Sequence, residues 1–364
     1  MKNINTMINS FSAYKPLFLS EDEVSKLKNS YPQIIIVDAF SRQIKELFFI
    51  DNLSYVGKEK KAVYADEVFK RYEAKKQNAY TYVYYPWNGH IVKTVRDKDY
   101  FRLKTNRNQD LITAAEQEKV SRYKVAVFGM SVGSNIAFVL TQAGISQEII
   151  LADFDELDTT NLNRIFGGAH QIGLNKSILA ARRIYEDNPY AKVTILPKGV
   201  NEKNLKSLLD RKKIDCLIDE IDFIPMKITI HRLAMEYKVP VIMVTDNGDG
   251  IVLHIERYDL GYKKIFHKEL DYWQDKMKQF ETEKGSEKKI AGGIIMDDIV
   301  GGVNLVDPKM LASVKKVLDN KLVSWSQLGS AAMLGGVYAT YALKKIIIDE
   351  DKRLEVRTHI NPHF

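Results

Sequence analysis

The sequence is almost free of cysteine: Cys216 is the single thiol among 364 residues. One thiol cannot form a disulfide within the chain, nor can it supply the paired Cys-x-x-Cys ligands of a structural zinc site. Such scarcity is typical of a protein from a reducing compartment. Because Cys216 stands in an apolar stretch, IDCLIDE, we expect it to be a buried core residue and not a reactive thiol.

Long apolar runs are also missing. No hydrophobic stretch approaches the roughly 18 to 20 residues that a membrane-spanning helix needs. Residues 1–15 lack the charged and then apolar pattern of a signal peptide. We therefore expect a cytoplasmic protein without a membrane segment.

Positive charge is only mildly in excess, because 54 basic residues face 47 acidic ones and give a formal net charge of +7. The densest basic stretch, residues 203–213, has helical spacing and is typical of a solvated helix face. No basic run is interleaved with aromatic residues, as a nucleic-acid interface would require. A nucleotide triphosphate suits the positive balance equally well, so nucleic acid is not the expected partner.

Proline and glycine, at 9 and 20 residues, are too few for a disordered or fibrous chain, whereas 45% of the residues are hydrophobic. The length predicts one large domain and one smaller domain. We place an N-terminal accessory domain, of α/β or α+β class, at residues 1–100. The larger domain would occupy 101–364, with a crossover or insertion region at 263–325.

The N-terminal segment has its own pattern. It predicts a polar helix at 20–31, a buried strand at 33–40, another strand at 45–50, and an aromatic strand at 81–87 before a turn at Asn88-Gly89. The aromatic residues of 81–90 are suited to gripping a peptide, so we consider this domain for substrate recognition.

The larger domain alternates short β-branched runs with amphipathic segments, which is typical of βαβ units. We therefore expect an α/β fold with a Rossmann-like, doubly wound and mostly parallel sheet. The predicted strands are 124–129, 148–155, 193–200, 214–220, 239–245 and 250–258, and helices are expected at 174–188 and 225–238. A charged helix at 263–285, a long helix with small residues at 330–349 and an edge strand at 354–360 would follow.

A glycine turn, Gly129-Met130-Ser131-Val132-Gly133-Ser134, lies between the first predicted strand and a helix. Glycine permits tight backbone conformations and lets a phosphate approach the N–H groups of a helix N-terminus. Asp153 ends the second strand, where a ribose hydroxyl would be bound. Candidate nucleotide contacts in the turn are therefore Gly129, Ser131, Gly133 and Ser134.

The same turn also matches Gly-x-Ser-x-Gly, which presents the nucleophile of a hydrolase. A triad would need an acid and a histidine after later strands. Asp246 and one of His254, His267, His359 or His363 would have to supply them.

A longer ordered motif distinguishes between these readings. The second strand is followed by Asp153-Phe154-Asp155, then by Asn161-Leu162-Asn163-Arg164, and then by Gly173-Leu174-Asn175-Lys176; a later strand ends in Asp219-Glu220-Ile221-Asp222. In order and spacing this run resembles the ubiquitin-activating and ThiF/MoeB family of adenylating enzymes. The resemblance extends from about residue 107 to 258 and recurs at GSAAMLGG, which is roughly half of the chain.

The resemblance implies Mg-ATP as the bound nucleotide and a carboxylate as the group that receives AMP. Asp153, with Asp155 beside it, would bind the ribose, and Asn161 would orient a phosphate or the attacking carboxylate. Arg164 and Lys176 would bind the phosphates. Asp222 would coordinate Mg²⁺, and Arg107 stands where family members contribute an arginine to the neighbouring subunit of a dimer.

The chain also departs from the family pattern. Ile165 replaces the usual glutamine after the Asn-x-Asn-Arg motif, and Phe223 replaces the asparagine after the magnesium aspartate. Relatives that form a thioester carry a catalytic cysteine, and many sulfur-carrier relatives bind zinc through four cysteines. The single buried Cys216 predicts neither property here.

The sequence therefore predicts a homodimeric adenylyltransferase that converts an acid, taken from the resemblance to be a peptide or ubiquitin-like C-terminus, into an acyl-adenylate without a thioester of its own. Segments outside the common core would choose the acid, including a loop at 263–305. Three alternatives remain open: an NAD-binding oxidoreductase, a non-catalytic partner subunit, and an enzyme that activates a carboxylate on tRNA. The first needs no Asn161 and Arg164, and the second would have lost the nucleotide contacts.

Overall fold

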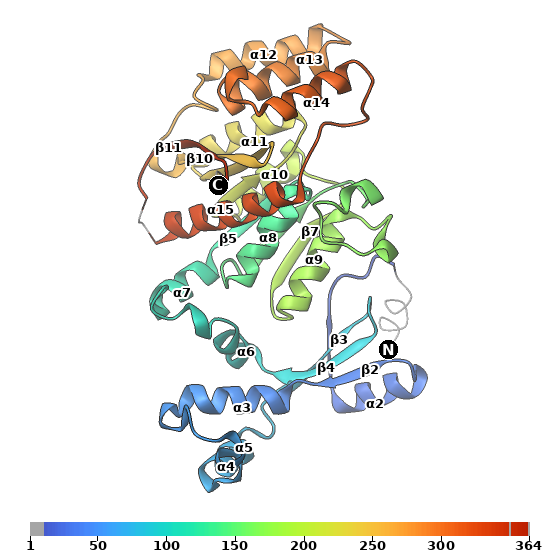
Figure 1. The fold of residues 1–364 in the computed structure, drawn as a ribbon, viewed down its shortest axis with the longest axis vertical. Coiled ribbons are helices and arrows are strands. Elements are labelled where there is room, and N and C mark those ends of the chain that lie inside the picture. The colour runs from blue at the N-terminus through green and yellow to red at the C-terminus, as the bar shows by residue number, and fades with distance from the viewer. Residues whose placement is uncertain (1–10, 349–350, 363–364) are drawn as a thin grey trace. The chain divides into compact units, whose positions relative to one another are not determined.

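The computed structural model describes residues 11–348 and 351–362. The chain divides into two compact units (Figure 1). The smaller one comprises the residues up to Ala114 together with Asn188–Tyr190, and the larger one comprises Ala115–Asp187 and Ala191–Phe364. None of the described helices is both long and apolar enough to cross a membrane.

The smaller unit is built on a four-stranded sheet with the order β1-β3-β4-β2. Strands β3 and β4 form an antiparallel hairpin whose turn contains Gly89 at φ +71°, as the Asn88-Gly89 pair predicts. Strand β2 lies parallel to β4 at one edge. The strands are β1 (Leu17–Leu19), β2 (Ile35–Asp38), β3 (Tyr80–Tyr85) and β4 (His90–Val95), and the α-helices are α2 (Glu21–Ser30), α3 (Phe40–Asp51), α4 (Lys60–Ala65), α5 (Glu67–Lys76) and α6 (Asp97–Lys104).

Two predictions for this unit are wrong. Residues 45–50 belong to helix α3 and not to a strand, because Ile44, Leu47 and Phe48 recur at helical spacing and bury one face of that helix. The strand predicted at 33–40 exists as β2, but it is not buried: Ile35 is 54% exposed. An edge strand pairs on one side only, and an apolar run in the sequence does not reveal whether a second layer will cover it.

The larger unit contains a seven-stranded sheet with the order β11-β10-β9-β8-β5-β6-β7. Strands β5 to β9 are parallel, and β10 and β11 add antiparallel strands at one edge. This is the expected α/β, Rossmann-like sheet. Its strands are β5 (Lys124–Phe128), β6 (Glu148–Ala152), β7 (Lys192–Leu196), β8 (Cys216–Asp219), β9 (Val241–Asn247), β10 (Gly250–Glu256) and β11 (Glu355–Ile360).

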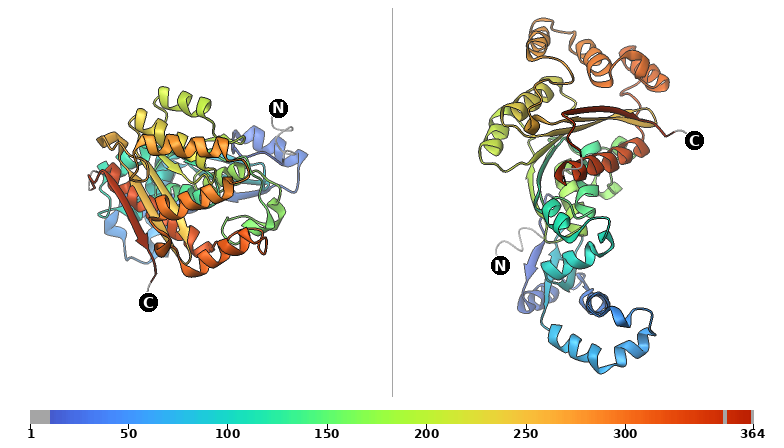
Figure 2. Two further views of the ribbon diagram at one scale, coloured as in Figure 1. Left: turned by 90° about the horizontal axis from the view of Figure 1, so that it is seen from above. Right: turned by 90° about the vertical axis from the view of Figure 1, so that its left-hand side faces the viewer.

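Helices cover both faces of this sheet (Figure 2). One face carries α8, α9 and α15, and the other carries α10 and α11. The helices of this unit that pack on the sheet are α8 (Val132–Gln142), α9 (Lys176–Asp187), α10 (Glu202–Asp210), α11 (Ile224–Glu236) and α15 (Gly329–Ile347); α7 (Ala114–Arg122) precedes β5.

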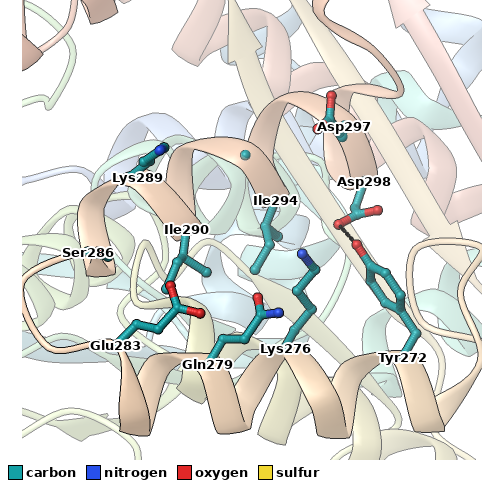
Figure 3. Close-up of a pocket in the computed structure, with 11 residues that line it drawn as sticks. Tyr272, Lys276, Gln279, Glu283, Ser286, Lys289, Ile290, Ile294, Asp297 and Asp298 are labelled. Atoms are coloured by element: carbon teal, nitrogen blue, oxygen red, sulfur yellow. Dashed lines mark hydrogen bonds between the residues drawn. The ribbon is translucent and has the colours of Figure 1, made fainter.

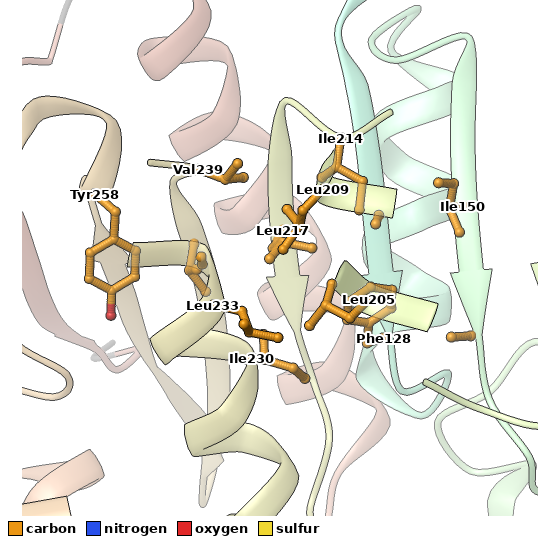
Figure 4. Packing of buried hydrophobic residues seen from close by; sticks show 14 residues of the cluster. Phe128, Ile150, Leu205, Leu209, Ile214, Leu217, Ile230, Leu233, Val239 and Tyr258 are labelled. Carbon is orange, nitrogen blue, oxygen red and sulfur yellow. The ribbon is translucent and has the colours of Figure 1, made fainter. Parts of the chain in front are cut away.

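The main core fills the space between the sheet and helices α10 and α11 (Figure 4). Alternate residues of a strand face one side of a sheet, and Ala126 and Phe128 of β5 accordingly face this core. Leu205 of α10 and Leu233 of α11 pack against them and are fully buried. Together they hold the carboxyl ends of the parallel strands in fixed positions.

Helix α15 approaches the opposite face closely, because small residues line its contact side. A Cβ atom on Gly335 would lie 2.9 Å from the Val244 side chain, and one on Gly336 would lie 3.1 Å from the backbone of Asn135. The long helix with a face of small residues, predicted at 330–349, is thus confirmed.

The charged helix predicted at 263–285 is present over Leu270–Thr282, but the segment 263–305 as a whole is not a loop. It folds into α12 (Leu270–Thr282), α13 (Glu287–Gly293), a π-helix η6 (Ile294–Val300) and a short turn η7 (Val303–Leu305), after which α14 (Pro308–Leu318) follows. Trp273, Phe266 and Ile294 give these helices a buried core of their own. A polar cavity of about 250 Å³ lies between α12 and α13, where Asp298 accepts a 2.8 Å hydrogen bond from the Tyr272 hydroxyl (Figure 3).

Candidate active site

The glycine turn joins the end of β5 to the start of α8. Gly129 has φ +90°, and a Cβ atom there would lie 2.3 Å from the backbone oxygen of Glu220. A Cβ atom on Gly133 would lie 2.9 Å from the Val127 side chain. Both glycines are therefore required by the backbone path. Ser134 donates a 2.9 Å hydrogen bond to the Ser131 carbonyl, so its hydroxyl serves the turn itself.

Asp153, just after β6, is the carboxylate that holds this turn in place. Its side chain is largely buried and accepts hydrogen bonds from the backbone N–H groups of Met130 at 2.6 Å and Asp155 at 2.8 Å. Burial raises the pKa of Asp153, while the two N–H groups and the Lys176 charge oppose that shift. Because a carboxylate oxygen accepts more than one hydrogen bond, Asp153 retains the capacity to bind a hydroxyl pair.

Lys176 begins helix α9 and points back to the same strand end. Its ammonium group lies 2.8 Å from Asp155 Oδ2, and its side chain is buried whereas that of Asp155 is half exposed. Asn175, which the sequence analysis did not single out, donates from its amide to the backbone oxygens of Asp153 and Asp155 at 3.0 and 3.2 Å. The loop after β6 and the start of α9 are thus fixed together.

Arg164 lies after the short turn η3 (Thr159–Asn161) and reaches the glycine turn. Its Nε donates to Ser131 Oγ at 3.0 Å, and its Nη1 donates to Asn163 Oδ1 at 2.9 Å. Burial lowers the pKa of Arg164, and the negative charges of Asp246 and Asp222 oppose that shift. Two carboxylates from other strand ends therefore act on this guanidinium.

Asn161 has a local structural role. Its side chain is buried, and Oδ1 accepts a 3.0 Å hydrogen bond from the Asp158 backbone N–H. Its backbone oxygen accepts from the Arg164 N–H at 3.0 Å. The structure therefore places Asn161 beneath Arg164 as part of the turn that presents the arginine.

Asp222 stands in the loop between β8 and α11. Although the residue reaches the surface, the protein around its carboxylate limits hydration and raises its pKa, against the positive charges of Lys227, Lys176 and Arg164. Because the charges of Lys176 and Arg164 act on Asp222, these three residues lie near one another although they are far apart in the sequence. They converge at the carboxyl edge of the parallel strands, where ligands bind in open α/β sheets.

Asp246, next to the last residue of β9, is a site residue that the sequence suggested only for a hydrolase. It is buried, its Oδ2 lies 3.4 Å from the Gln327 amide, and its Oδ1 has no hydrogen-bond partner among the described residues. Burial raises the pKa of Asp246 to about 6, against the Arg164 charge. Its position at the carboxyl end of a predicted strand could have identified it, since Asp153 and Asp222 lie just beyond the carboxyl ends of β6 and β8.

Replacing Asp246 with asparagine is expected to stabilise the protein at pH 8 and to change it little at pH 4. An acid whose pKa is raised in the folded state contributes stability that is present below its unfolded pKa and is lost as pH rises through the folded value. The wild-type protein loses this stability between about pH 4 and pH 6. At pH 8 the asparagine variant should therefore have a free energy of unfolding about 2–3 kcal/mol higher than the wild type. Urea unfolding at both pH values measures it; an equal effect at both would contradict the prediction.

The hydrolase alternative gains no support from these contacts. Ser131 Oγ accepts from the Arg164 guanidinium, and no described histidine bonds to it. His267 instead pairs with Glu355 at 2.8 Å, and His359 lies 3.0 Å from the Val300 backbone oxygen. His254 is buried on β10, and His363 lies outside the described residues.

Cys216 is confirmed as a core residue. It lies on β8, its side chain is fully buried, and burial raises the pKa of its thiol. A buried, protonated thiol is a poor nucleophile.

Native Cys216 is therefore expected to resist alkylation. Incubation with iodoacetamide at pH 8 should label it only after denaturation, as mass spectrometry would show. Replacing it with serine should leave the chemistry at the strand ends intact while lowering the free energy of unfolding by about 1–3 kcal/mol, the cost of an unpaired buried hydroxyl. Rapid labelling of the folded protein would refute the core assignment.

The structure also locates the arginine expected to act across a dimer and the two residues that depart from the family pattern. Arg107 lies in the short turn Asn106–Asn108 of the smaller unit. Ile165, which replaces the usual glutamine, is buried as a packing residue. Phe223, which replaces the usual asparagine, is 65% exposed at the start of α11 beside Asp222.

The donor set suits a magnesium nucleotide better than a metal held by protein alone. Among the described residues, no group of three or more His, Cys, Asp or Glu side chains is placed to hold a metal ion. Mg²⁺ commonly takes one or two carboxylates and completes its shell with water and substrate phosphates. Asp222 supplies such a carboxylate, and the buried Asp246 Oδ1, which has no hydrogen-bond partner among the described residues, is a second oxygen whose charge acts on the same Arg164.

Comparison with known proteins gives a family match over most of the larger unit. The model described as the ThiF family matches residues 103–361. An uncharacterized protein of Mycobacterium tuberculosis, MT1398, is 32% identical over 281 residues, which is 75% of this chain and 37% of that protein.

Two relatives with descriptive names match shorter segments. The tRNA threonylcarbamoyladenosine dehydratase of Bacillus subtilis is 31% identical over 38% of this chain and 54% of its own length. The ubiquitin-like modifier-activating enzyme 5 of Gallus gallus is 27% identical over 33% of both chains. The matches thus span about a third to a half of these relatives.

Proposed function

The chain belongs to the ThiF family, and on that premise we propose that it is an adenylyltransferase: it transfers AMP from ATP to a carboxylate and releases pyrophosphate. The observation that carries this proposal is the convergence of Asp153, Arg164, Lys176 and Asp222 around the Gly129 turn. This set combines a hydroxyl acceptor, two phosphate-binding cations and a magnesium carboxylate.

Each side chain has a defined task in this proposal. Asp153 binds the ribose hydroxyls, and the turn at Gly129 and Gly133 lets phosphate approach the N-terminus of α8. Arg164 offers a planar fork for two phosphate oxygens, whereas Lys176 supplies a point charge. Since the acid attacks the α-phosphate, these groups act by aligning the reactants and by neutralising the charge that builds on the phosphate oxygens.

Asp222 is the residue proposed to hold Mg²⁺. The metal would supply charge neutralisation on the phosphates. Burial raises the pKa of Asp222, and the positive charges of Lys227, Lys176 and Arg164 oppose that rise.

The acid is proposed to leave as an acyl-adenylate or to pass to a separate acceptor. Cys216, the single thiol, is buried in β8 and cannot attack an adenylate without unfolding. We propose a peptide or small carrier-protein C-terminus as the acid, which the name of the Gallus gallus relative supports. The accessory unit and the helices at 263–325 are the proposed recognition elements, and Arg107 is proposed to act across a homodimer.

An acid on tRNA is the second candidate, because one relative is a tRNA-modifying dehydratase. A salt titration separates the two. Binding to tRNA should weaken steeply as salt rises, whereas a peptide held by apolar contacts should respond little.

The test of the proposal is exchange of labelled pyrophosphate into ATP in the presence of Mg²⁺, with and without candidate peptides. Adenylylation predicts exchange that depends on the acid and that disappears in Asp222→Ala. Binding of NAD together with indifference to ATP would overturn the proposal in favour of an oxidoreductase.

A further inference from the structure

Four ionisable side chains form a cluster in the interior of the larger unit, next to the loop that carries Asp222. Asp219 lies at the end of β8, Lys227 and His231 lie on α11, and Glu256 ends β10. All four are at least nine-tenths buried. Buried ionised groups are rare unless they are paired, so their mutual contacts require an explanation.

The contacts form one continuous chain. Lys227 Nζ lies 2.9 Å from Asp219 Oδ2, and His231 Nε2 lies 3.2 Å from the same oxygen. His231 Nδ1 lies 2.5 Å from Glu256 Oε2. Tyr258, also buried, donates its hydroxyl to Glu256 Oε2 at 2.5 Å.

The cluster is balanced in charge when His231 is protonated. Burial disfavours the imidazolium, but the charges of Glu256 and Asp219 and their hydrogen bonds outweigh it and raise the pKa of His231. Two carboxylates then face one lysine and one imidazolium. Replacing the imidazole by a neutral group would leave two buried negative charges with a single positive one.

At its two ends this series of contacts holds two backbone segments: the loop before Asp222 and the start of the 263–325 region. Asp219 Oδ1 accepts a 3.1 Å hydrogen bond from the N–H of Ile221, the residue immediately before Asp222. At the other end, Glu256 Oε1 accepts a 2.6 Å hydrogen bond from the N–H of Phe266, at the start of the helical 263–325 region. Phe266 has φ +44°, an uncommon conformation that this contact helps to maintain.

We propose that His231 is a positioning residue for Asp222: held by Glu256, it joins Lys227 in fixing Asp219, and Asp219 in turn holds the 219–222 loop in the geometry that receives the magnesium nucleotide. This inference rests on the proposed role of Asp222. A buried ion network stabilises a fold no better than well-packed apolar side chains do. Leucine or phenylalanine at these four positions could not hydrogen-bond to the 219–222 loop. Orienting that loop is therefore the contribution that the ionisable side chains can make.

The test compares His231→Gln with His254→Gln. His254 is equally buried and its ring also contacts Phe266, with centroids 5.5 Å apart, but it bonds to neither carboxylate of the cluster. Two quantities are measured for each variant by calorimetry: ATP affinity in EDTA, and the Mg²⁺ concentration that gives half of the tightening caused by the metal.

The His231→Gln variant should need about 10–100-fold more Mg²⁺, the usual effect of losing an outer contact to a metal site, while its metal-free ATP affinity stays within about 2-fold of the wild type. His254→Gln should match the wild type in both quantities. An unchanged magnesium requirement in a folded His231→Gln protein, or an equal change in His254→Gln, overturns the positioning role.

Lys227 provides a second pair of variants should His231→Gln not fold. Lys227→Arg keeps the charge beside Asp219 and should retain the magnesium requirement of the wild type, whereas Lys227→Met should raise it by a similar 10–100-fold. Equal behaviour of the two overturns the inference. Failure of the proposed function is distinguishable, because in that case the wild-type protein itself would bind no ATP.

Discussion

Replacing Arg164 with alanine is expected to lower acid-dependent ATP–pyrophosphate exchange by about 10²–10³-fold while the protein remains folded. The guanidinium is held beside the glycine turn by Ser131 Oγ and Asn163 Oδ1, with bonds of 3.0 and 2.9 Å. It therefore needs no reorganisation when charge builds on a phosphate, and such fixed charges give the largest single contributions to catalysis.

The steady-state exchange rate measures this prediction, and two variants control it. Arg183→Ala removes an arginine of α9 that lies over the rings of Phe138 and Phe166, and it should leave exchange nearly unchanged. Arg164→Lys keeps the charge but loses the planar fork, so its rate should fall between the alanine variant and the wild type. Exchange in Arg164→Ala within about 3-fold of the wild type would remove this residue from the catalytic set.

Replacing Gly129 with alanine is expected to cost about 4 kcal/mol or more in the free energy of unfolding. Two penalties combine at this position: φ is +90°, and the new Cβ would lie 2.3 Å from the Glu220 oxygen. The backbone cannot retreat, because Gly129 N–H donates to Ala152 and Glu220 N–H donates to Phe128, both at 2.8 Å. The collision would push apart two neighbouring strand ends of the site.

Gly173→Ala is the matched control for Gly129→Ala. Gly173 has nearly the same conformation, with φ +84°, but a Cβ atom there would meet nothing within 4 Å. Only the conformational penalty remains, which is about 1–2 kcal/mol. Urea unfolding of both variants measures the difference. Equal losses would mean that the close contact with Glu220 is relieved at little cost.

Most of the parallel sheet could be predicted from the sequence because each strand is a short β-branched run between helical segments. The small unit was harder. Its KELFFI run is apolar enough for a strand or a helix, and only the spacing of Leu47 with its neighbours distinguishes the two. The exposure of β2 depends on which strands become sheet edges, which local sequence does not encode.

The site was predictable where its residues lie in one ordered motif. Asp153, Arg164 and Lys176 stand in or next to a single βαβ unit, and they keep the spacing of a known family. Asp246 and the contacts of His231 were missed because their partners come from distant strands and helices. Asn161 stands in the same motif, and its oxygen caps the turn beneath Arg164. Its contact with a phosphate or the attacking carboxylate stays a prediction.

The antiparallel pairing of β10 with β11 has a consequence for how the protein can change. Glu256 pairs with Glu355, so the chain makes an excursion through α12, α13 and α14 and then covers the sheet with α15 before the paired strand follows. The entropic cost of closing such an excursion rises only with the logarithm of its length, by about 0.6 kcal/mol for each doubling. Insertions or exchanges among α12, α13 and α14 therefore cost the sheet little, which leaves this segment free to diversify while the strand ends keep their chemistry.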